Sequence, residues 1–184
     1  MARGSAGVLV ALPDGNAVRI RVARPGDAAG LLSFLQRVFA ETDLLLKGPG
    51  EAPADVLEQA GLIRGWRRAA NSTCLVGELD GEIVAHLVVF GNPLLRRRHV
   101  GEVGMSVLRR LWGRGIGSAM LQQAVDWATR SPVLRKLTLQ VYASNRRAIR
   151  LYERFGFQVE GVLRAEVLRD DGRYEDLLVM SRAV

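Results

Sequence analysis

The sequence predicts an α+β fold in which helices cover a largely antiparallel β-sheet. Short β-branched runs joined by turn signals alternate with helical patterns, and one connection, from residues 99–107 to residues 136–142, has the form of a β–α–β crossover. With 184 residues, of which 48% are hydrophobic and 24% charged, the chain is long enough for one hydrophobic core. We therefore expect a single domain over residues 1–184, with residues 1–16 as an N-terminal extension that includes the first hairpin strand.

The predicted elements begin with a hairpin and a helix. Residues 13–16, Pro-Asp-Gly-Asn, are a typical turn sequence between two short β-branched runs, residues 8–12 and 18–22. Asp27 follows a Pro-Gly pair and is a candidate helix N-cap. Apolar residues then recur at helical spacing as far as about residue 41, which predicts an amphipathic first helix.

A second helix and a central hairpin come next. Residues 54–70 have a helical pattern that two internal glycines weaken, so we expect a bent or broken helix. Residues 73–79 and 83–90 are strand-like, and they are joined by Asp80-Gly81, one of the strongest short-range hairpin signals. These two runs predict an antiparallel pair of strands.

The following strand, residues 99–107, contains two glycines. Gly101 and Gly104 have no side chain to pack, and glycine inside a strand often marks a β-bulge or a close approach of a ligand or another backbone. Similar signals predict the remaining elements, which are a helix from about 117 to 130, a strand over 136–142, a helix from Asn145 to Gly156, and strands over 157–160, 162–168 and 174–180.

The net charge of +7 is concentrated in the middle of the chain. Residues 94–154 contain 13 Arg and Lys against 3 Asp and Glu, which predicts that this segment binds an anionic ligand. A nucleic-acid partner is not expected, because aromatic residues make up only 6% of the chain and do not alternate with the arginines as a base-stacking surface would require.

Cysteine content, histidine content and hydropathy exclude other classes. Cys74 is the only cysteine and there are two histidines, so neither an intrachain disulfide nor a His/Cys metal site is expected. No apolar run approaches the roughly 20 residues that span a membrane. The apolar run near the N-terminus is too short for a signal peptide. We therefore expect a metal-free cytoplasmic protein with no membrane partner.

Gly113, Gly115 and Gly117 lie between a predicted strand and the start of a predicted helix. Glycines at such a position let main-chain N–H groups converge on an anion that the helix dipole also favours, and phosphate is the natural ligand. A flexible turn with exposed arginines is the alternative. A Walker loop is excluded because no Gly-Lys-Ser/Thr occurs, and the dinucleotide-binding fingerprint fails because Met120 stands at its third glycine.

Two motifs resemble those of the GNAT superfamily of N-acetyltransferases. Residues 107–118 (VLRRLWGRGIGS) resemble its acetyl-CoA pyrophosphate loop, Q/R-x-x-G-x-G/A, with Trp112 at the position of Gln or Arg. Residues 145–157 (NRRAIRLYERFGF) resemble its second signature, N-x-x-A-x-x-L-Y-x-x-x-G-F, and match every fixed position. The resemblance extends over about residues 18–180. It implies the GNAT fold, a mostly antiparallel twisted sheet flanked by about four helices, with acetyl-CoA as the acetyl donor.

The resemblance also implies where the donor binds. The strand before the loop should diverge from its neighbour at a bulge, so that its main chain can pair with the pantetheine arm. Exposed arginines that follow Asn145 either reach the 3′-phosphate or are simply solvated. The implied binding residues are Met105, Ser106, Val107 and Asn145 for the arm, Trp112, Gly113, Arg114, Gly115, Ile116, Gly117 and Ser118 for the pyrophosphate, and Arg147, with Arg146 and Arg150, for the 3′-phosphate.

The same resemblance implies two catalytic residues. Tyr152 resembles the tyrosine that protonates the departing thiolate, and Glu102 lies on the strand where relatives carry a carboxylate that takes the amine proton; an ordinary ion pair is the alternative for Glu102. His99 is an alternative base. His86 lies in an apolar strand and is expected to be a hydrogen-bonded core imidazole. Cys74 has no histidine partner, so a covalent acyl-cysteine is not expected.

We therefore expect a metal-free N-acetyltransferase that moves acetyl directly from acetyl-CoA to a primary amine of a small molecule, a protein N-terminus or a lysine. Between Glu41 and Glu58 there are five acidic residues against Lys47, so a cationic acceptor is one candidate and a solvated helix face is the alternative. A non-catalytic acyl-CoA sensor of the same fold is the rival function. A homodimer is compatible with the sequence.

Overall fold

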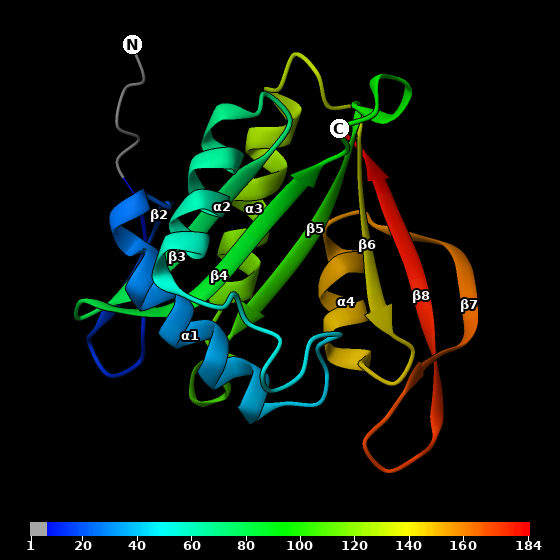
Figure 1. Cartoon of the computed structure of the whole chain (residues 1–184), viewed down its shortest axis with the longest axis horizontal. Coiled ribbons are helices and arrows are strands. Elements are labelled where there is room, and N and C mark those ends of the chain that lie inside the picture. Colours follow the sequence, from blue (N-terminus) through cyan, green and yellow to red (C-terminus); the bar gives the residue numbers. More distant parts are fainter. Residues whose placement is uncertain (1–6) are drawn as a thin grey trace.

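The computed structural model describes residues 7–184, and the first six residues of the expected N-terminal extension lie outside it. The described residues form eight strands and four α-helices (Figure 1). The strands are β1 (Val8–Ala11), β2 (Ala17–Val22), β3 (Thr73–Leu79), β4 (Glu82–Gly91), β5 (Val100–Val107), β6 (Lys136–Tyr142), β7 (Gln158–Leu168) and β8 (Tyr174–Ala183). The α-helices are α1 (Ala28–Glu41), α2 (Val56–Arg68), α3 (Ile116–Thr129) and α4 (Arg146–Arg154), and short 3-10 helices are η1 (Pro25–Asp27), η2 (Leu95–Arg97) and η3 (Arg109–Leu111).

The strands form one sheet in the order β1-β2-β3-β4-β5-β6-β8-β7. Neighbouring strands are antiparallel except β5 and β6, which are parallel and are connected through α3. A parallel pair needs such a long crossover, because a tight turn can join only antiparallel strands. The prediction of a largely antiparallel sheet with one β–α–β crossover is confirmed.

Two helix predictions differ from the structure. α2 is continuous, because the Asp55 carboxylate accepts a main-chain N–H of the first turn (2.8 Å) and the glycines Gly61 and Gly65 lie on its exposed face. Asp27 precedes α1 but does not cap it with its side chain. Its carboxylate instead accepts two hydrogen bonds from the guanidinium of Arg21 (2.7 and 2.8 Å).

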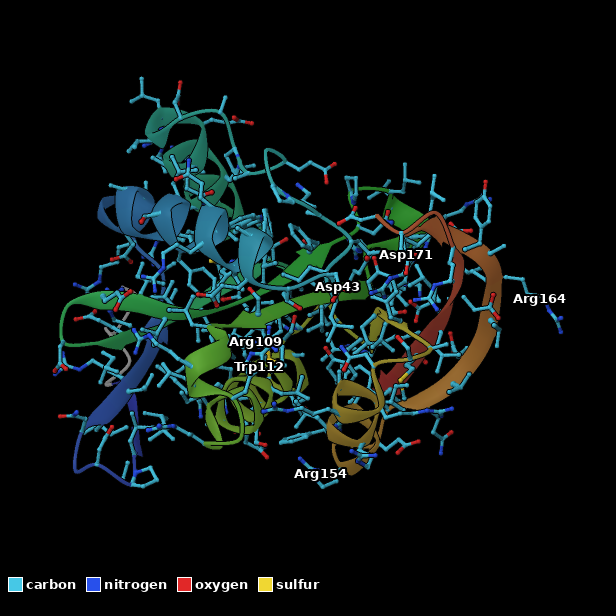
Figure 2. The ribbon with its side chains drawn as sticks, turned by 90° about the horizontal axis from the view of Figure 1, so that it is seen from below. Asp43, Arg109, Trp112, Arg154, Arg164 and Asp171 are labelled. Atoms are coloured by element: carbon cyan, nitrogen blue, oxygen red, sulfur yellow. The ribbon has the colours of Figure 1, made fainter. Side chains whose placement is uncertain are left out.

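The helices cover both faces of the sheet. α1 and α2 lie on one face, and α3 and α4 lie on the other (Figure 2). The central strands β3 and β4 are therefore buried along almost their whole length, as expected for strands with helices on both sides. Among residues 7–184, no helix is both long enough and apolar enough to cross a membrane.

The sheet opens between β5 and β6. The two strands remain paired at only three positions, Val100 with Lys136, Gly101 with Leu137 and Glu102 with Thr138. Beyond these positions they diverge, and the gap between them widens towards the bottom of the view in Figure 1. The register of β5 with β4 is unbroken from Gly101 to Val107, so the predicted bulge is absent and the expected divergence is present without it.

The two glycines of β5 have a packing role in place of the predicted bulge. A Cβ atom on Gly101 would lie 2.7 Å from Val89 Cγ1 and 3.3 Å from the side chains of Leu134 and Leu137, which are all buried. A Cβ atom on Gly104 would meet only ordinary contacts, at 3.5 Å or more. Gly101 therefore allows the core to close against β5 within the short stretch where β5 and β6 are still paired.

We expect Gly101→Ala to lower the free energy of unfolding by about 1–3 kcal/mol, because the new methyl group overpacks a closed core. Urea denaturation measures this change, with an unchanged m-value. Gly161→Ala is the matched control, since a Cβ there meets nothing within 4 Å, and its effect should stay within about 0.5 kcal/mol. Equal stability of the two variants would contradict the packing role of Gly101.

Candidate active site

The divergence of β5 from β6 leaves main-chain groups of β5 free. Asn92 N–H donates to Val100 O (3.2 Å), and Leu108 N–H donates to Val84 O (3.0 Å), which fixes the phase of the antiparallel β4–β5 ladder. Residues along such a ladder alternate between those bonded to the partner strand and those directed away from it. The residues of β5 beyond Gly101 whose main-chain groups face away from β4 are therefore Val103, Met105 and Val107, and the pairing of Glu102 with Thr138 uses the N–H of Val103.

Among the residues expected to pair with the pantetheine arm, Met105 has the free strand edge. Ser106 is in phase with β4, so only its side chain is available to the cavity. The carbonyl oxygen of Val107 accepts a hydrogen bond from the indole Nε1–H of Trp112 (2.7 Å). The N–H and C=O of Met105 remain for an extended ligand that contains amide groups, which would bind as an added strand does.

The loop after β5 presents main-chain N–H groups at the start of α3. Gly113 (φ +83°) and Gly115 (φ +80°) adopt the left-handed conformation that glycine favours, and Gly115 is the N-cap of α3. Within residues 7–184, the N–H groups of residues 113–118 donate no hydrogen bond. They can hold a phosphate together with the positive end of the helix dipole. Gly117 has an ordinary φ, and a Cβ there would lie 3.5 Å from Leu151.

Trp112 in this loop contacts a cation from α4, on the other side of the split. The guanidinium carbon of Arg147, on α4, lies 5.1 Å from the centroid of the Trp112 ring, a cation–π distance. A Cβ on Gly113 would lie 4.0 Å from Arg147 Nη2, so the positive charge is close to the loop amides. Arg114 points elsewhere and forms an ion pair with Asp14 (3.3 Å).

Asn145 and Tyr152 line the cavity at α4. Asn145 Oδ1 accepts the N–H of Ala148 (3.1 Å) and caps the helix, which leaves the side-chain amino group for a ligand. Tyr152 is only 7% exposed, and its ring packs against Phe157 with centroids 5.9 Å apart. Burial raises the pKa of Tyr152 to about 12, so the phenol keeps its proton at neutral pH. This phenol can therefore act as an acid.

Glu102 is an unpaired carboxylate at the point where the sheet splits. It is exposed, it lines the cavity, and within residues 7–184 it forms no ion pair, so the salt-bridge alternative is not observed. His99 lies outside the cavity lining, at the opposite end of β5 from the loop. The geometry therefore favours Glu102 over His99 as a base.

These groups line one cavity of ≈ 1170 Å³. It exceeds the roughly 300–1,000 Å³ of pockets that hold one drug-sized ligand, so it has room for a long donor and an acceptor. One wall consists of α4, β6 and the loop before α3, and the other of α1, α2 and the segment between them. The sequence analysis did not single out the cavity-lining residues of the second wall, Leu44, Leu45, Leu46, Gln59, Leu62 and Trp66, or Phe90 of β4 beside them. The one sequence signal of this wall, the helical spacing of 59, 62 and 66, is also typical of core residues.

The acidic residues between Glu41 and Glu58 do not line the cavity. Each of them is a hydrogen-bond acceptor within the chain, and most of them organise the segment between α1 and α2. Glu41 accepts from Arg109 N–H, Asp43 from the Arg169 side chain, Glu51 from Gly48 N–H, Asp55 from Glu58 N–H and Glu58 from Ala54 N–H. Their clustering is therefore explained by local structure and does not by itself argue for a cationic acceptor.

Cys74 and His86 are buried, with different consequences. Burial raises the pKa of the Cys74 thiol, which makes it a poor nucleophile. His86 was expected to be hydrogen-bonded, but within the described chain its Nε2 has no partner. Burial lowers the pKa of His86 to about 4, so the imidazole is neutral at pH 7. Residues 7–184 contain no group of three or more His, Cys, Asp or Glu side chains arranged to hold a metal.

An amide-lined phosphate cradle, a free strand edge and a buried phenol in one cleft define the class of this protein as a transferase of the acyl-CoA-binding type. The chain belongs to the acetyltransferase (GNAT) family, whose family model matches residues 39–157. This assignment agrees with the two motifs, since the match contains the loop before α3 and extends through α4 to Phe157.

Known proteins with similar sequences or folds support this assignment. The L-amino acid N-acetyltransferase AaaT of Escherichia coli (strain K12) is 32% identical over 108 residues, which are 59% of this chain and 66%, slightly under two thirds, of that relative. An acetyltransferase of the GNAT family from Streptococcus pneumoniae has a TM-score of 0.87 and 31% identity over 91% of this chain and 99% of its own. A phosphinothricin acetyltransferase of the GNAT superfamily from Sinorhizobium meliloti, in complex with acetyl-CoA, has a TM-score of 0.79 and 18% identity over 91% and 88% of the two chains. The fold is thus one that binds acetyl-CoA.

We expect Gly115→Ala to remove most of the thermal stabilisation that acetyl-CoA gives to the protein. A ligand at 100 times its Kd adds about 2.7 kcal/mol, and a Cβ at Gly115 would occupy the cradle. Gly172→Ala is the matched control, because Gly172 has the same positive φ (+81°) in the turn between β7 and β8, away from the cavity. Thermal shift with and without millimolar acetyl-CoA distinguishes the two variants. A full ligand shift in Gly115→Ala would show that the loop is only a turn.

We also expect Trp112→Leu and Arg147→Gln to weaken acetyl-CoA binding by similar factors, roughly 3- to 30-fold. If Trp112 acts by holding Arg147, the double variant should bind no more weakly than the weaker single variant. Calorimetric titration with acetyl-CoA measures this cycle. Arg164→Gln is the control, because Arg164 projects from β7 away from the rest of the molecule (Figure 2). Additive losses in the double variant would mean that the two residues act independently.

Proposed function

We propose that this GNAT-family protein transfers acetyl from acetyl-CoA directly to a primary amine of a small molecule, a protein N-terminus or a lysine. The observation that carries the proposal is that a protonated phenol, Tyr152, and an unpaired carboxylate, Glu102, line the same cavity as the free strand edge of Met105. Direct acyl transfer needs an acid, a base and main-chain donors. A sensor needs none of these groups, and no feature of residues 7–184 favours that rival function.

The donor side of the cleft binds acetyl-CoA and orients its pantetheine arm. Acetyl-CoA, when bound, supplies the carbonyl carbon that the amine attacks. The amides of residues 113–118 hold the phosphates, and the main chain of Met105 aligns the pantetheine arm as an added strand. The N–H group of Met105, which is directed into the split, stabilises the negative charge that develops on the thioester oxygen. The sheet therefore contributes both positioning and electrostatic stabilisation.

Two side chains carry the protons. Glu102 takes the proton of the attacking amine, directly or through water, as the C–N bond forms. Tyr152 donates its proton to the sulfur as the C–S bond breaks, and its raised pKa keeps the proton in place until then. The proton that Glu102 gains equals the one that Tyr152 loses, so exchange with solvent restores both groups for the next turnover.

The acceptor enters along the wall formed by α1, α2 and the segment between them, because the other wall carries the groups that suit the phosphates. Most residues of this acceptor wall are apolar, and Glu102 is the one acidic residue among the described residues that line the cavity. An amine with an apolar substituent suits such a wall better than a polycation does. The name of the curated relative, an L-amino acid N-acetyltransferase, supports an acceptor of the α-amine kind.

Release of free thiol from acetyl-CoA in the presence of an amine panel tests the proposal. The panel contains peptides, free amino acids, aryl-alkylamines and polyamines, and release should require both acetyl-CoA and one of these amines. Binding of acetyl-CoA without amine-dependent release from any member of the panel would contradict the enzyme function and favour the sensor.

We expect Tyr152→Phe to lower kcat by about 10²–10⁴-fold while the Kd for acetyl-CoA changes little, because the ring remains and only the proton is lost. Tyr174→Phe is the control, because Tyr174 is exposed and lies outside the cavity. Since the pKa of Tyr152 is about 12, its proton should be retained up to that pH, so its ionisation should not lower kcat between pH 7 and 10. Near-normal turnover by Tyr152→Phe would assign the acid to water or to another side chain.

A further inference from the structure

Two buried side chains on the acceptor side of the cavity have polar atoms with no hydrogen-bond partner among the described residues. Gln59 is 0% exposed and His86 is 8% exposed. Within the described residues, Gln59 Nε2, Gln59 Oε1 and His86 Nε2 make no hydrogen bond. Both residues line the cavity. Gln59 belongs to α2, which covers one face of the sheet, and His86 belongs to β4, a strand of the sheet itself. The two residues that carry the unpartnered atoms therefore belong to one cavity, one on a helix and one on the sheet.

A folded protein rarely keeps such groups without a reason. Burying an amide or an imidazole without a hydrogen-bond partner destabilises the fold, and an apolar side chain of the same shape would remove that cost. Ordered water or a ligand completes the hydrogen bonds of such groups, and in a binding cavity the ligand can replace the water. Because the phosphates suit the opposite wall, the ligand that reaches Gln59 and His86 is the acceptor.

The chemistry of the two groups restricts the acceptor. Gln59 offers an NH₂ donor group and a carbonyl acceptor, and an uncharged amide matches both, whereas a carboxylate would face Oε1 with like partial charge. His86 is neutral, because burial lowers its pKa to about 4, and adds one further hydrogen bond. Lys47 is the one cation on the described acceptor wall and Glu102 the one acidic residue of the cavity, so neither a free carboxylate nor a polyamine finds enough partners.

The surroundings of His86 suit an extended chain with an apolar side chain. Trp66 lies edge-on to Phe90, with ring centroids 5.7 Å apart, and 6.3 Å from the ring of His86. Phe90 is opposite Glu102 in the β4–β5 register, and His86 is opposite Ser106, so four residues, or about 13 Å of strand, separate the proposed base from the far end of the pocket. A peptide presents an amide about every 3.4 Å along this length.

Resting on the proposed acetyl transfer, we propose that the acceptor is the N-terminal amine of a peptide, whose amide groups hydrogen-bond to Gln59 and His86 and whose apolar side chain packs on Trp66 and Phe90. Gln59 and His86 thus determine acceptor specificity, while Glu102 and Tyr152 carry the protons. Free amino acids and polyamines are poorer acceptors, because the same pocket leaves their charges unpaired.

Calorimetric titration of acceptors into the protein saturated with CoA tests this proposal without turnover. The probes are the tripeptide amide phenylalanyl-alanyl-alaninamide, free phenylalanine, 2-phenylethylamine and spermidine. The tripeptide amide should bind most tightly. Gln59→Met should weaken its binding roughly 5- to 100-fold, and His86→Phe should do the same, whereas the affinity for 2-phenylethylamine should change less than about 2-fold. The Kd for acetyl-CoA should be unchanged in both variants.

The stability of the unliganded protein supplies an independent readout. The Tm of Gln59→Met should equal or exceed that of the original protein, because an unpartnered buried amide is replaced by an apolar chain of similar shape. Gln122→Met makes the same chemical change on the exposed side of α3 and should alter neither acceptor affinity nor specificity.

Three results would overturn the proposal. These are tighter binding of spermidine or phenylalanine than of the tripeptide amide, equal losses of affinity for the tripeptide amide and for 2-phenylethylamine in Gln59→Met, or a lower Tm in that variant. A failure of acetyl transfer itself would appear differently. Thiol release would then be absent with every amine, while the titrations with CoA would still report whether the peptide site exists.

Discussion

The early end of the β5–β6 pairing is the constraint on which the rest of the structure depends. Main-chain groups inside a sheet normally find partners along the whole strand, and those left over must be satisfied in another way. Beyond Glu102, β5 has lost its neighbour on one side. Trp112 satisfies the carbonyl of Val107, and the edge at Met105 remains for a ligand. Helices cover both faces of the sheet around this split, and in the proposed binding mode the donor takes the position of the missing strand.

Ion pairs, a cation–π contact and a hydrogen bond across this split hold the acceptor wall in place. Arg169, beyond β7, pairs with Asp43 and with Glu175 (2.5 Å), and its guanidinium lies 5.4 Å from the centroid of the Tyr142 ring. The Tyr142 hydroxyl donates to the carbonyl of Leu45 (3.3 Å). The segment after α1 is therefore tied to the end of β6 and to the β7–β8 hairpin. In this segment the carboxylates shape the wall, while its surface towards the cavity stays mostly apolar.

Both sides of the cleft contain polar groups whose hydrogen bonds the described chain does not complete, and the groups differ between the two sides. On the donor side, the free amides of residues 113–118 and the cation of Arg147 form a site that suits an anion. On the acceptor side, Gln59 and His86 keep unpartnered polar atoms in a pocket lined by aromatic rings. A chain selected for stability alone would fill both places differently, and such departures are expected where a protein binds its ligands.

The sequence by itself determined the order of the elements and predicted the donor loop and the candidate acid Tyr152, because these depend on local periodicity, turn residues and short motifs. It also determined that α+β packing would contain one parallel crossover. Only the tertiary structure decided that α2 is continuous, that Met105 rather than Ser106 offers the free edge, and that Trp112 holds Arg147. Hydrogen-bond phase and contacts between residues far apart in the chain are set when the elements pack together. The lack of hydrogen-bond partners for Gln59 and for His86 Nε2 among the described residues is likewise a property of the assembled cavity, which no local pattern encodes.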